Sequence, residues 1–400
     1  MIADEGRIPM PFSALFEDLT ALDEKGLRRR RRTLDCAQTA HVTVDGKKYL
    51  AFCSNDYLGL ASHPALIAAA QAGATQYGVG AGASHLVLGH TRAHDELEQQ
   101  LAAFVGLPRA LLFSTGYMAN LGIVTALLGR DDAVFADRLN HASLNDACLL
   151  ARAQFKRYAH NDLAQLERLL AATKARRKLI VVDAVFSMDG DIAPVPELLS
   201  LAERYDAWLL LDDAHGFGVL GTGGRGVLEH FAIRYTSRII YMATLGKAAG
   251  VFGAFVAGHD PLIETLMQRA RSYIYTTAMP PLLACAVSKS ITLIAAGAPL
   301  RKRLSENIIL LKQMLAHGQP EGWRLLPSLT AIQPLVIGDN HAATAVAEKL
   351  AARGVLVPAI RPPTVPPGTA RLRISLSAAH AADDVRVLCH ALCDVSQAVH

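Results

Sequence analysis

The chain has 400 residues, of which 51% are apolar and 19% are charged, and its formal net charge is +4. This composition excludes a largely disordered chain and is typical of a folded protein with a large core. The length predicts one large and one smaller domain, and the small net charge gives no reason to expect a nucleic-acid-binding protein.

The first 50 residues are expected to form an N-terminal segment, 1–50, made of a helix and a hairpin. Apolar residues recur at helical spacing between residues 10 and 32, which predicts an amphipathic helix there. The basic run RRRRR at 28–32 is interpreted as a solvated face of that helix. The stretch HVTVDGKKYLAF alternates apolar residues around Asp45-Gly46, which indicates a β-hairpin.

A large α/β domain, 51–290, is expected to follow. Short apolar runs alternate with helix-like segments, which predicts a mostly parallel sheet covered on both faces, with ligands at the carboxyl ends of its strands. From about residue 290 the pattern changes to that of a smaller α+β domain, 291–400. The apolar runs of the large domain lie at 110–113, 133–137, 178–186, 207–215, 238–244 and 252–258.

Polar groups follow several of these strands. After the run ending at residue 113, a turn leads into a helix that Gly116 and Tyr117 would open, and free N–H groups at a helix start can bind phosphate. From the residues alone, an ordinary strand-to-helix turn is an equal alternative. His141 and Ser187 lie just after two other strands, where a lone histidine can also be structural.

Two further strand ends carry Asp212, His215 and Lys247. After the stretch LLLDDAHGFG begins, Gly216, Gly218 and Gly221 match a GxGxxG spacing, but loop-like sequence follows it, so a dinucleotide-binding turn is rejected. The stretch LGKAAG lacks the first glycine and the Ser/Thr of a P-loop. Lys247 lies among small and apolar residues, where a lysine either extends its ammonium to water or is held for chemistry.

These strand ends together fit pyridoxal 5′-phosphate, an aldehyde that a lysine holds as a Schiff base while an acid keeps its ring nitrogen protonated. The phosphate would lie at the helix start, the acid would be Asp212 and the lysine would be Lys247. Desolvation lowers the pKa of a lysine and makes it nucleophilic, which explains the apolar surroundings of Lys247.

No other feature of the sequence points to a metal, a membrane or secretion. The six cysteines are scattered without a CxxC pair, which favours reduced thiols in a cytoplasmic protein and no metal site. No apolar run approaches the about 18–20 residues of a bilayer span, and the N-terminus lacks a signal-peptide pattern. We expect a cytoplasmic protein.

Several stretches resemble, in their order, the signatures of the α-oxoamine synthases, a family of fold-type I pyridoxal-phosphate enzymes. The resemblance covers roughly residues 20 to 395 and implies a large domain built on a mostly parallel seven-stranded sheet. The C-terminal runs AIQPLVIGDN and AIRPPTVPPGTARLRISLSAAH are similar to the member that makes a biotin precursor. The other stretches are SNDYLGL, GHTRAHDELEQQLAAF, FSTGYMAN, DRLNHASL, VFSMDGDIAP, DDAHGFGVLGTGGRG and TLGKAAG.

The resemblance implies a reaction and a role for each site residue. The reaction is the decarboxylative condensation of L-alanine with pimeloyl-CoA or pimeloyl-carrier protein, by a homodimer whose subunits share the site. Lys247 would bind the cofactor aldehyde, and the other expected catalytic residues are Asp212 at the ring nitrogen, His215 at the ring oxygen and His141 stacked on the ring. Further cofactor contacts would be Gly116, Tyr117, Ser187, Thr244 and, on the partner's phosphate, Thr276 or Thr277. Substrate contacts would be Arg28, His141, Thr364 and Arg373.

Other functions stay open at this point. A synthase of the same family could use glycine or serine with another acyl-CoA. An aminotransferase fits less well, because the signatures are not of that type. A non-catalytic nucleotide-binding module would predict a colourless protein. The departures from the family pattern are Asp183 where glutamate is usual, Ala83, His90 and Phe217, and none of them removes a group that the chemistry needs.

Overall fold

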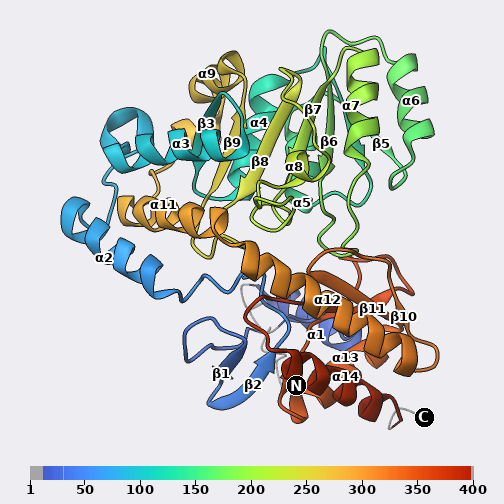
Figure 1. Cartoon of the computed structure of the whole chain (residues 1–400). Helices are drawn as coiled ribbons and strands as arrows, with labels where there is room; N and C mark the ends of the chain where they lie inside the picture. The colour runs from blue at the N-terminus through green and yellow to red at the C-terminus, as the bar shows by residue number, and fades with distance from the viewer. Residues whose placement is uncertain (1–11, 30, 398–400) are drawn as a thin grey trace, which may run out of the picture.

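The structure is a computed structural model that describes residues 12–29 and 31–397 (Figure 1). Its larger part is built on a sheet of seven strands in the order β3-β9-β8-β7-β6-β4-β5 within the described residues. Only β9 runs antiparallel to its neighbours there, so the mostly parallel sheet that the sequence predicts is confirmed. The strands are β3 (Arg109–Phe113), β4 (Ala133–Asp137), β5 (Gln154–Tyr158), β6 (Lys178–Asp183), β7 (Trp208–Asp212), β8 (Ile239–Thr244) and β9 (Ala254–Gly258).

Helices cover both faces of this sheet and enclose one apolar core on each side. On one face, α4 (Gly116–Leu127), α5 (Ala142–Leu150) and α9 (Asp260–Arg269) pack on the apolar side chains of the strands. The other face is covered by α3 (Arg92–Val105), α6 (Leu163–Ala172) and α7 (Val195–Arg204). The remaining helices of this part are α2 (Pro64–Tyr77), the π-helix η1 (His85–Gly89), α8 (Val227–His230), α10 (Arg271–Ile274) and α11 (Pro281–Ala295).

Strand β5 is the member of the sheet that no apolar run indicated. Its residues, QFKRY, are mostly polar, and the strand lies at the edge of the sheet beside β4. An edge strand buries less of its surface, so it needs no continuous apolar stretch.

The C-terminal part is a smaller α+β unit, drawn in the lower half of Figure 1. An antiparallel sheet in the order β10-β11-β14-β13 packs against three helices. Its strands are β10 (Arg324–Leu325), β11 (Ile332–Gly338), β13 (Ala359–Ile360) and β14 (Ala370–Ser375), and its helices are α12 (Ala298–Gly318), α13 (Asn340–Ala352) and α14 (Ala382–Gln397).

The predicted hairpin is present and joins this C-terminal part. Strands β1 (His41–Val44) and β2 (Lys47–Ala51) are connected by Asp45 and Gly46, both with positive φ, as a tight hairpin turn requires. Strand β2 also pairs in parallel with β12 (Val355–Leu356), with Leu50 opposite Val355. A segment from the N-terminal part and one from the C-terminal part of the chain therefore share one small sheet.

The predicted helix over residues 10–32 is shorter than expected. Helix α1 covers Ser13–Glu24, and residues 10 and 11 lie outside the described residues. Gly26 adopts φ 61° and its N–H donates to the carbonyl of Asp23 at 2.9 Å, a left-handed ending that glycine favours. The described arginines of the run 28–32 are exposed but follow the helix, so the helical-face interpretation was wrong.

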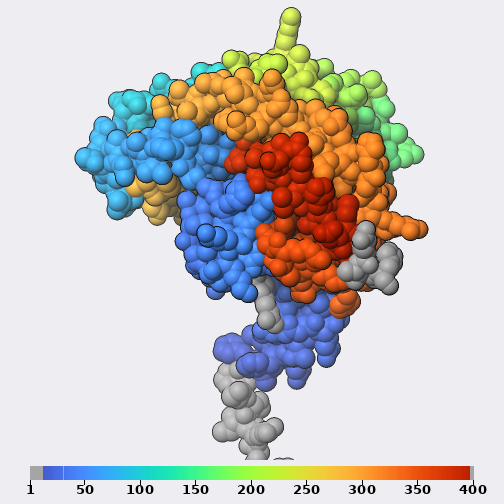
Figure 2. Space-filling view, turned by 60° about the horizontal axis from the view of Figure 1, so that its bottom comes forward, coloured from blue at the N-terminus to red at the C-terminus, as the bar shows by residue number. Residues whose placement is uncertain are grey.

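The apolar side chains of α1 do not reach the core. Leu15, Phe16, Leu19 and Leu22 are all exposed, Phe16 to 60%. In Figure 2 the dark-blue N-terminal residues project from the body of the molecule. Within the described ranges, no single helix has the length and apolarity to cross a bilayer, and one helix pair bent by 70° passes that test by length and composition alone.

Candidate active site

Lys247 lies in a tight loop that connects β8 to β9. The loop is closed by the N–H of Leu245, which donates to the carbonyl of Gly253 at 2.8 Å, and it turns where the N–H of Gly250 donates to the carbonyl of Lys247 at 2.8 Å. Gly250 has φ +69°, and a Cβ there would lie 2.6 Å from the backbone nitrogen of Ala61. Only glycine fits this position, so the local sequence fixes where the lysine begins.

The Lys247 side chain points to His215. Its Nζ lies 2.9 Å from Nε2 of His215. Burial lowers the pKa of Lys247 to about 8, against the opposing charges of Asp212 and Asp183. About a tenth of the amine is therefore neutral at pH 7, far more than for an ordinary lysine, and the neutral amine is the form that acts as a nucleophile or base.

The hydroxyl of Tyr57 forms a hydrogen bond with the other ring nitrogen of His215. Nδ1 lies 2.6 Å from the hydroxyl of Tyr57, which is also 3.1 Å from Oδ1 of Asn55. Burial, followed by the nearby charge of Lys247, keeps the pKa of His215 well below 6.5. The imidazole is therefore neutral at neutral pH, with its ring fixed by two hydrogen bonds.

Asp212 ends strand β7 and is 5% exposed. Its Oδ2 accepts a hydrogen bond from Nδ2 of Asn120 at 2.8 Å, and its Oδ1 accepts one from the N–H of Ala214 at 3.1 Å. Asn120 comes from α4 and also donates to Oγ of Ser143 at 2.9 Å. The carboxylate is thus oriented from two sides while it lines the cavity.

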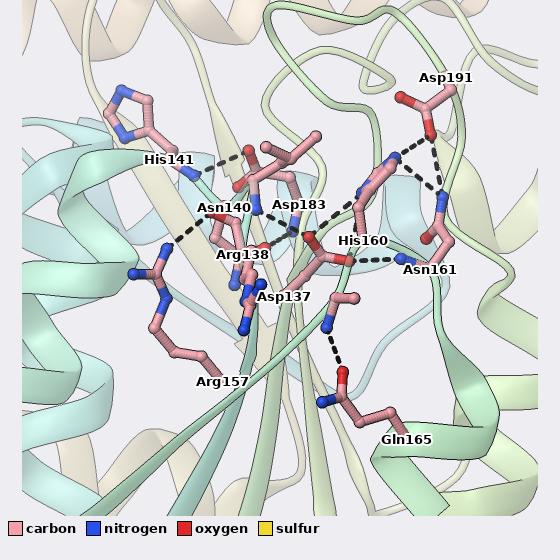
Figure 3. A network of polar contacts seen from close by, with 12 residues as sticks. Asp137, Arg138, Asn140, His141, Arg157, His160, Asn161, Gln165, Asp183 and Asp191 are labelled. Atoms are coloured by element: carbon pink, nitrogen blue, oxygen red, sulfur yellow. Dashed lines mark hydrogen bonds and ion pairs between the residues drawn. The ribbon is translucent and has the colours of Figure 1, made fainter. Parts of the chain in front are cut away.

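Asp183 ends the neighbouring strand β6 and holds the start of α5 (Figure 3). Its Oδ2 accepts a hydrogen bond from the N–H of His141 at 3.0 Å, whereas its buried Oδ1 has no partner among the described residues. Burial, then the charge of Asp212, raises the pKa of Asp183 well above 3.8. Burial also disfavours the charged form of His141 and lowers its pKa, although the negative charge of Asp212 opposes this shift.

The start of α4 has the geometry that the predicted anion site needs. Gly116 and Tyr117 open the helix, and the Thr115 side chain caps it by accepting from the N–H of Met118 at 3.2 Å. The first N–H groups of a helix have no partner within the helix and favour an anion. A Cβ at Gly116 would lie 4.0 Å from Cβ of Thr244, so the end of β8 adds a hydroxyl beside this start.

These groups meet in one cavity of about 190 Å³ at the carboxyl ends of the strands. A larger cavity, about 740 Å³, lies beside Trp208 near the opposite ends of β7 and β8 and contains none of the predicted site residues. The predicted residues that line the smaller cavity are Gly116, Tyr117, His141, Ser187, Asp212, His215, Thr244 and Lys247, joined by Asn120, Ser143, Asp183, Val185, Ala214 and Met242.

Arg373 lies next to this cavity rather than in its lining. It is 5% exposed; its Nε donates to the carbonyl of Ser187 at 2.5 Å and its Nη1 to Oδ1 of Asn55 at 3.1 Å. Since Asn55 also contacts Tyr57, a chain of hydrogen bonds joins Arg373 to His215. Tyr57 and Asn55 were not predicted as site residues, although the motif SNDYLGL contains them.

Three other predicted residues lie away from the cavity in the single chain, namely Arg28, Thr364 and Thr277. Arg28 is exposed and pairs with Asp23 at 2.6 Å. Thr364 is exposed, and its N–H donates to the carbonyl of Arg361 at 3.1 Å. Arg361 in turn donates to the carbonyl of Gly26, so Arg28 and Thr364 flank one contact between the N- and C-terminal parts.

Thr277 is exposed and bridges to Ser84. Its carbonyl accepts a hydrogen bond from Oγ of Ser114 at 3.5 Å, close to the start of α4. Its hydroxyl is not part of the cavity lining of its own chain.

A half-buried lysine, a fixed carboxylate and a helix start around one cavity at a sheet edge are the groups that a pyridoxal-phosphate-dependent enzyme needs. Residues 47–392 match the model of the family "Aminotransferase class I and II". The chain is 63% identical over 397 residues to 8-amino-7-oxononanoate synthase of Nitrosospira multiformis, with 99% of each chain covered.

Solved structures agree with these matches. A serine palmitoyltransferase variant from S. paucimobilis, with a bound PLP–myriocin aldimine, has a TM-score of 0.90 at 30% identity over 97% of this chain and 98% of that one. The 8-amino-7-oxononanoate synthase of Francisella tularensis has a TM-score of 0.76 at 32% identity, with 88% and 98% covered. The chain belongs to the aminotransferase class I and II family and, within it, to the 8-amino-7-oxononanoate synthases. The family resemblance seen in the sequence and the fold-type I architecture are thereby confirmed.

Proposed function

We propose that the protein condenses L-alanine with the thioester of pimeloyl-CoA or pimeloyl-carrier protein. The products are 8-amino-7-oxononanoate, carbon dioxide and the free thiol of CoA or of the carrier, in biotin biosynthesis. The observation that carries this proposal is the Lys247 amine, 2.9 Å from His215 in the cavity that Asp212 lines. The 63% identity to a protein of that name supports the choice of substrates.

The residues of the cavity fit pyridoxal 5′-phosphate. The N–H groups of Gly116 and Tyr117 and the hydroxyl of Thr244 would hold the phosphate, and Asp212 would pair with the ring nitrogen. Oδ1 of Asn120 and Oδ1 of Asp183 are buried and have no hydrogen-bond partner among the described residues. Both residues line the cavity, so these oxygens are free to accept hydrogen bonds from a bound group. When bound, the cofactor supplies an electron sink for negative charge at the α-carbon of the amino acid.

Lys247 would bind the cofactor aldehyde and later move a proton. In its neutral form the Nζ lone pair can take the proton from the α-carbon of alanine, and the resulting ammonium can return it after loss of carbon dioxide. The neutral Nε2 of His215 can accept a hydrogen bond from that ammonium at the observed 2.9 Å. His215 would therefore orient Lys247 between its two tasks.

Binding of the two substrates would use different parts of the chain. Arg373 would bind the carboxylate of alanine, because its guanidinium is buried and offers charge-assisted hydrogen bonds next to Ser187. His141 would face the reacting groups from the start of α5. Arg28 and Thr364 would bind the acyl substrate where the N- and C-terminal parts meet.

We also propose a cytoplasmic homodimer that contacts neither nucleic acid nor membrane. The exposed apolar side chains of α1 support a covered interface. A partner subunit would also explain why Arg28 and Thr277 lie away from the cavity of their own chain, since each could serve the neighbouring site. All six cysteines are unpaired, which supports a reducing compartment.

A spectrum of the purified protein tests the proposed function. Pyridoxal phosphate should give a visible absorbance band that changes on addition of L-alanine, and pimeloyl-CoA should then yield the oxoamine and carbon dioxide. Lys247→Ala should abolish the band and turnover, whereas Asp212→Asn should bind the cofactor but turn over far more slowly. Turnover of Lys247→Ala at the wild-type rate would overturn the proposal.

Competition between alanine, glycine and serine separates the proposed function from its alternative. The fold similarity to serine palmitoyltransferase keeps another acyl transfer to glycine or serine as the second candidate. Preferred use of glycine or serine would favour that candidate.

A further inference from the structure

His160 bridges two carboxylates outside the cavity (Figure 3). It lies in the turn after β5, with Nδ1 3.2 Å from Oδ1 of Asp137 and Nε2 2.9 Å from Oδ2 of Asp191. A neutral imidazole carries one N–H and could donate to only one of these carboxylates. Two carboxylates at the two ring nitrogens favour the doubly protonated imidazolium, although Nδ2 of Asn161 also lies 3.2 Å from Nε2.

The surroundings of His160 favour that cation. Burial opposes the charge, but the hydrogen bonds and charges of Asp137 and Asp191 outweigh it and raise the pKa of His160 to about 10. Asp137 ends β4, is fully buried, and also accepts from the N–H of Asn161 at 2.8 Å. The Asn161 side chain donates to Oδ2 of Asp191 at 3.0 Å, so the bridge is supported on both sides.

Asp191 closes a turn over residues 186–191. The N–H of Phe186 donates to the carbonyl of Asp191 at 3.0 Å, and the N–H of Gly190 donates to the carbonyl of Phe186 at 2.8 Å. The His160 ring packs edge-on against Phe186, with centroids 4.4 Å apart. His160 thus holds both ends of this turn.

The same turn also binds two buried arginines from β14. Arg371 donates to Oδ1 of Asp189 at 2.7 Å, and Arg373 donates to the carbonyl of Ser187 at 2.5 Å. These are charge-assisted hydrogen bonds, whose strength depends on geometry. A shift of the turn would therefore move the guanidinium of Arg373.

We propose that His160 is a positioning residue: by bridging Asp137 and Asp191 it fixes the turn 186–191 and thereby aims Arg373 at the carboxylate of the amino-acid substrate. The identity of that substrate rests on the proposed function, whereas the fixing of the turn does not. His160 itself does not line the cavity.

Hydrogen exchange in the cofactor-free protein tests the first half of this proposal. His160→Gln removes the cation but keeps a polar side chain, and Asp191→Asn keeps the size of the side chain and removes its charge. Either variant should speed amide exchange at Phe186 and Gly190, while peptides from β4 and β6 keep their wild-type rates. His317→Gln, at an exposed position in α12, is the matched control.

Titration of the cofactor-loaded protein with L-alanine, without any thioester, tests the second half. The dissociation constant for alanine should rise about tenfold in His160→Gln and Asp191→Asn, as when a charge-assisted contact loses its geometry. Affinity for pyridoxal phosphate and the KM for the thioester should stay within about twofold. In turnover, the KM for alanine should rise more than kcat falls.

Unchanged exchange in the turn together with unchanged alanine affinity in both variants would overturn the proposal. Faster exchange across the whole molecule would also overturn it, since it would indicate a general loss of structure. If the wild type makes no product from alanine and pimeloyl-CoA, the proposed function fails, and the exchange experiment still decides the role of His160 in the turn.

Discussion

At the scale of single residues, burial sets the pH range in which Lys247 can react. Its pKa of about 8 means that the neutral amine dominates above pH 8 rather than above the ordinary 10.5. We predict that the rate at which cofactor-free protein captures pyridoxal phosphate rises with pH, is half-maximal near pH 8 and levels off about one pH unit higher. Stopped-flow absorbance between pH 6 and 10 measures this, with a free lysine derivative as the reference amine. A rate that keeps rising to pH 10 would contradict the prediction.

His85 makes a second residue-scale prediction, on acid stability. Burial, followed by the charges of His94 and His90, lowers the pKa of His85 to about 3. The neutral ring, stacked on Tyr273 with centroids 5.0 Å apart, stabilises the fold fully above pH 6.5, and this contribution is lost as the pH falls towards 3. Between pH 7 and pH 5 the loss should be about 2 kcal/mol.

His85→Phe keeps the aromatic stacking and removes the titration. The free energy of unfolding, measured in urea at both pH values, should therefore fall by about 2 kcal/mol less in this variant than in the wild type. His390→Gln, at an exposed position of α14, is the control and should behave as the wild type does. Equal acid sensitivity of His85→Phe and the wild type would be the contrary result.

At the scale of elements, the start of α4 depends on one side chain. Thr115 caps the helix by accepting from the N–H of Met118. Thr115→Ala should lower the free energy of unfolding by about 1 kcal/mol, because the cap is lost while the fold is kept. Thr115→Ser retains the hydroxyl acceptor and should lower the free energy of unfolding much less. Denaturant unfolding of the two variants side by side gives the difference.

At the same scale, the residues explain what could be predicted from the sequence. Strands buried on both faces are continuous apolar runs, so their carboxyl ends, and with them Asp212 and Lys247, could be located along the chain. Strand β5 could not, because an edge strand with polar residues lacks that signal. Tyr57 could not be placed beside His215 either, because that contact joins residues 158 positions apart.

At the scale of the whole molecule, the exposed face of α1 predicts self-association. The mass in sedimentation equilibrium should be twice the 42.8 kDa of one chain. Phe16→Asp combined with Leu19→Asp should weaken the dimer, since both side chains are exposed on the apolar face. Glu17→Gln, on the opposite side of the helix, should leave it unchanged. A wild-type mass of one chain would refute the prediction.

The pairing of β2 with β12 has a consequence for how the protein is made. Leu50 meets Val355 only after about 300 further residues have left the ribosome, roughly 15–60 s later at typical speeds of synthesis. Asn55 and Tyr57 follow β2 directly, and the carbonyl of Tyr57 accepts from the N–H of Ala378 at 2.8 Å. The nascent chain can assemble its central sheet early, but the groups that fix His215 must wait for translation of the C-terminal strands.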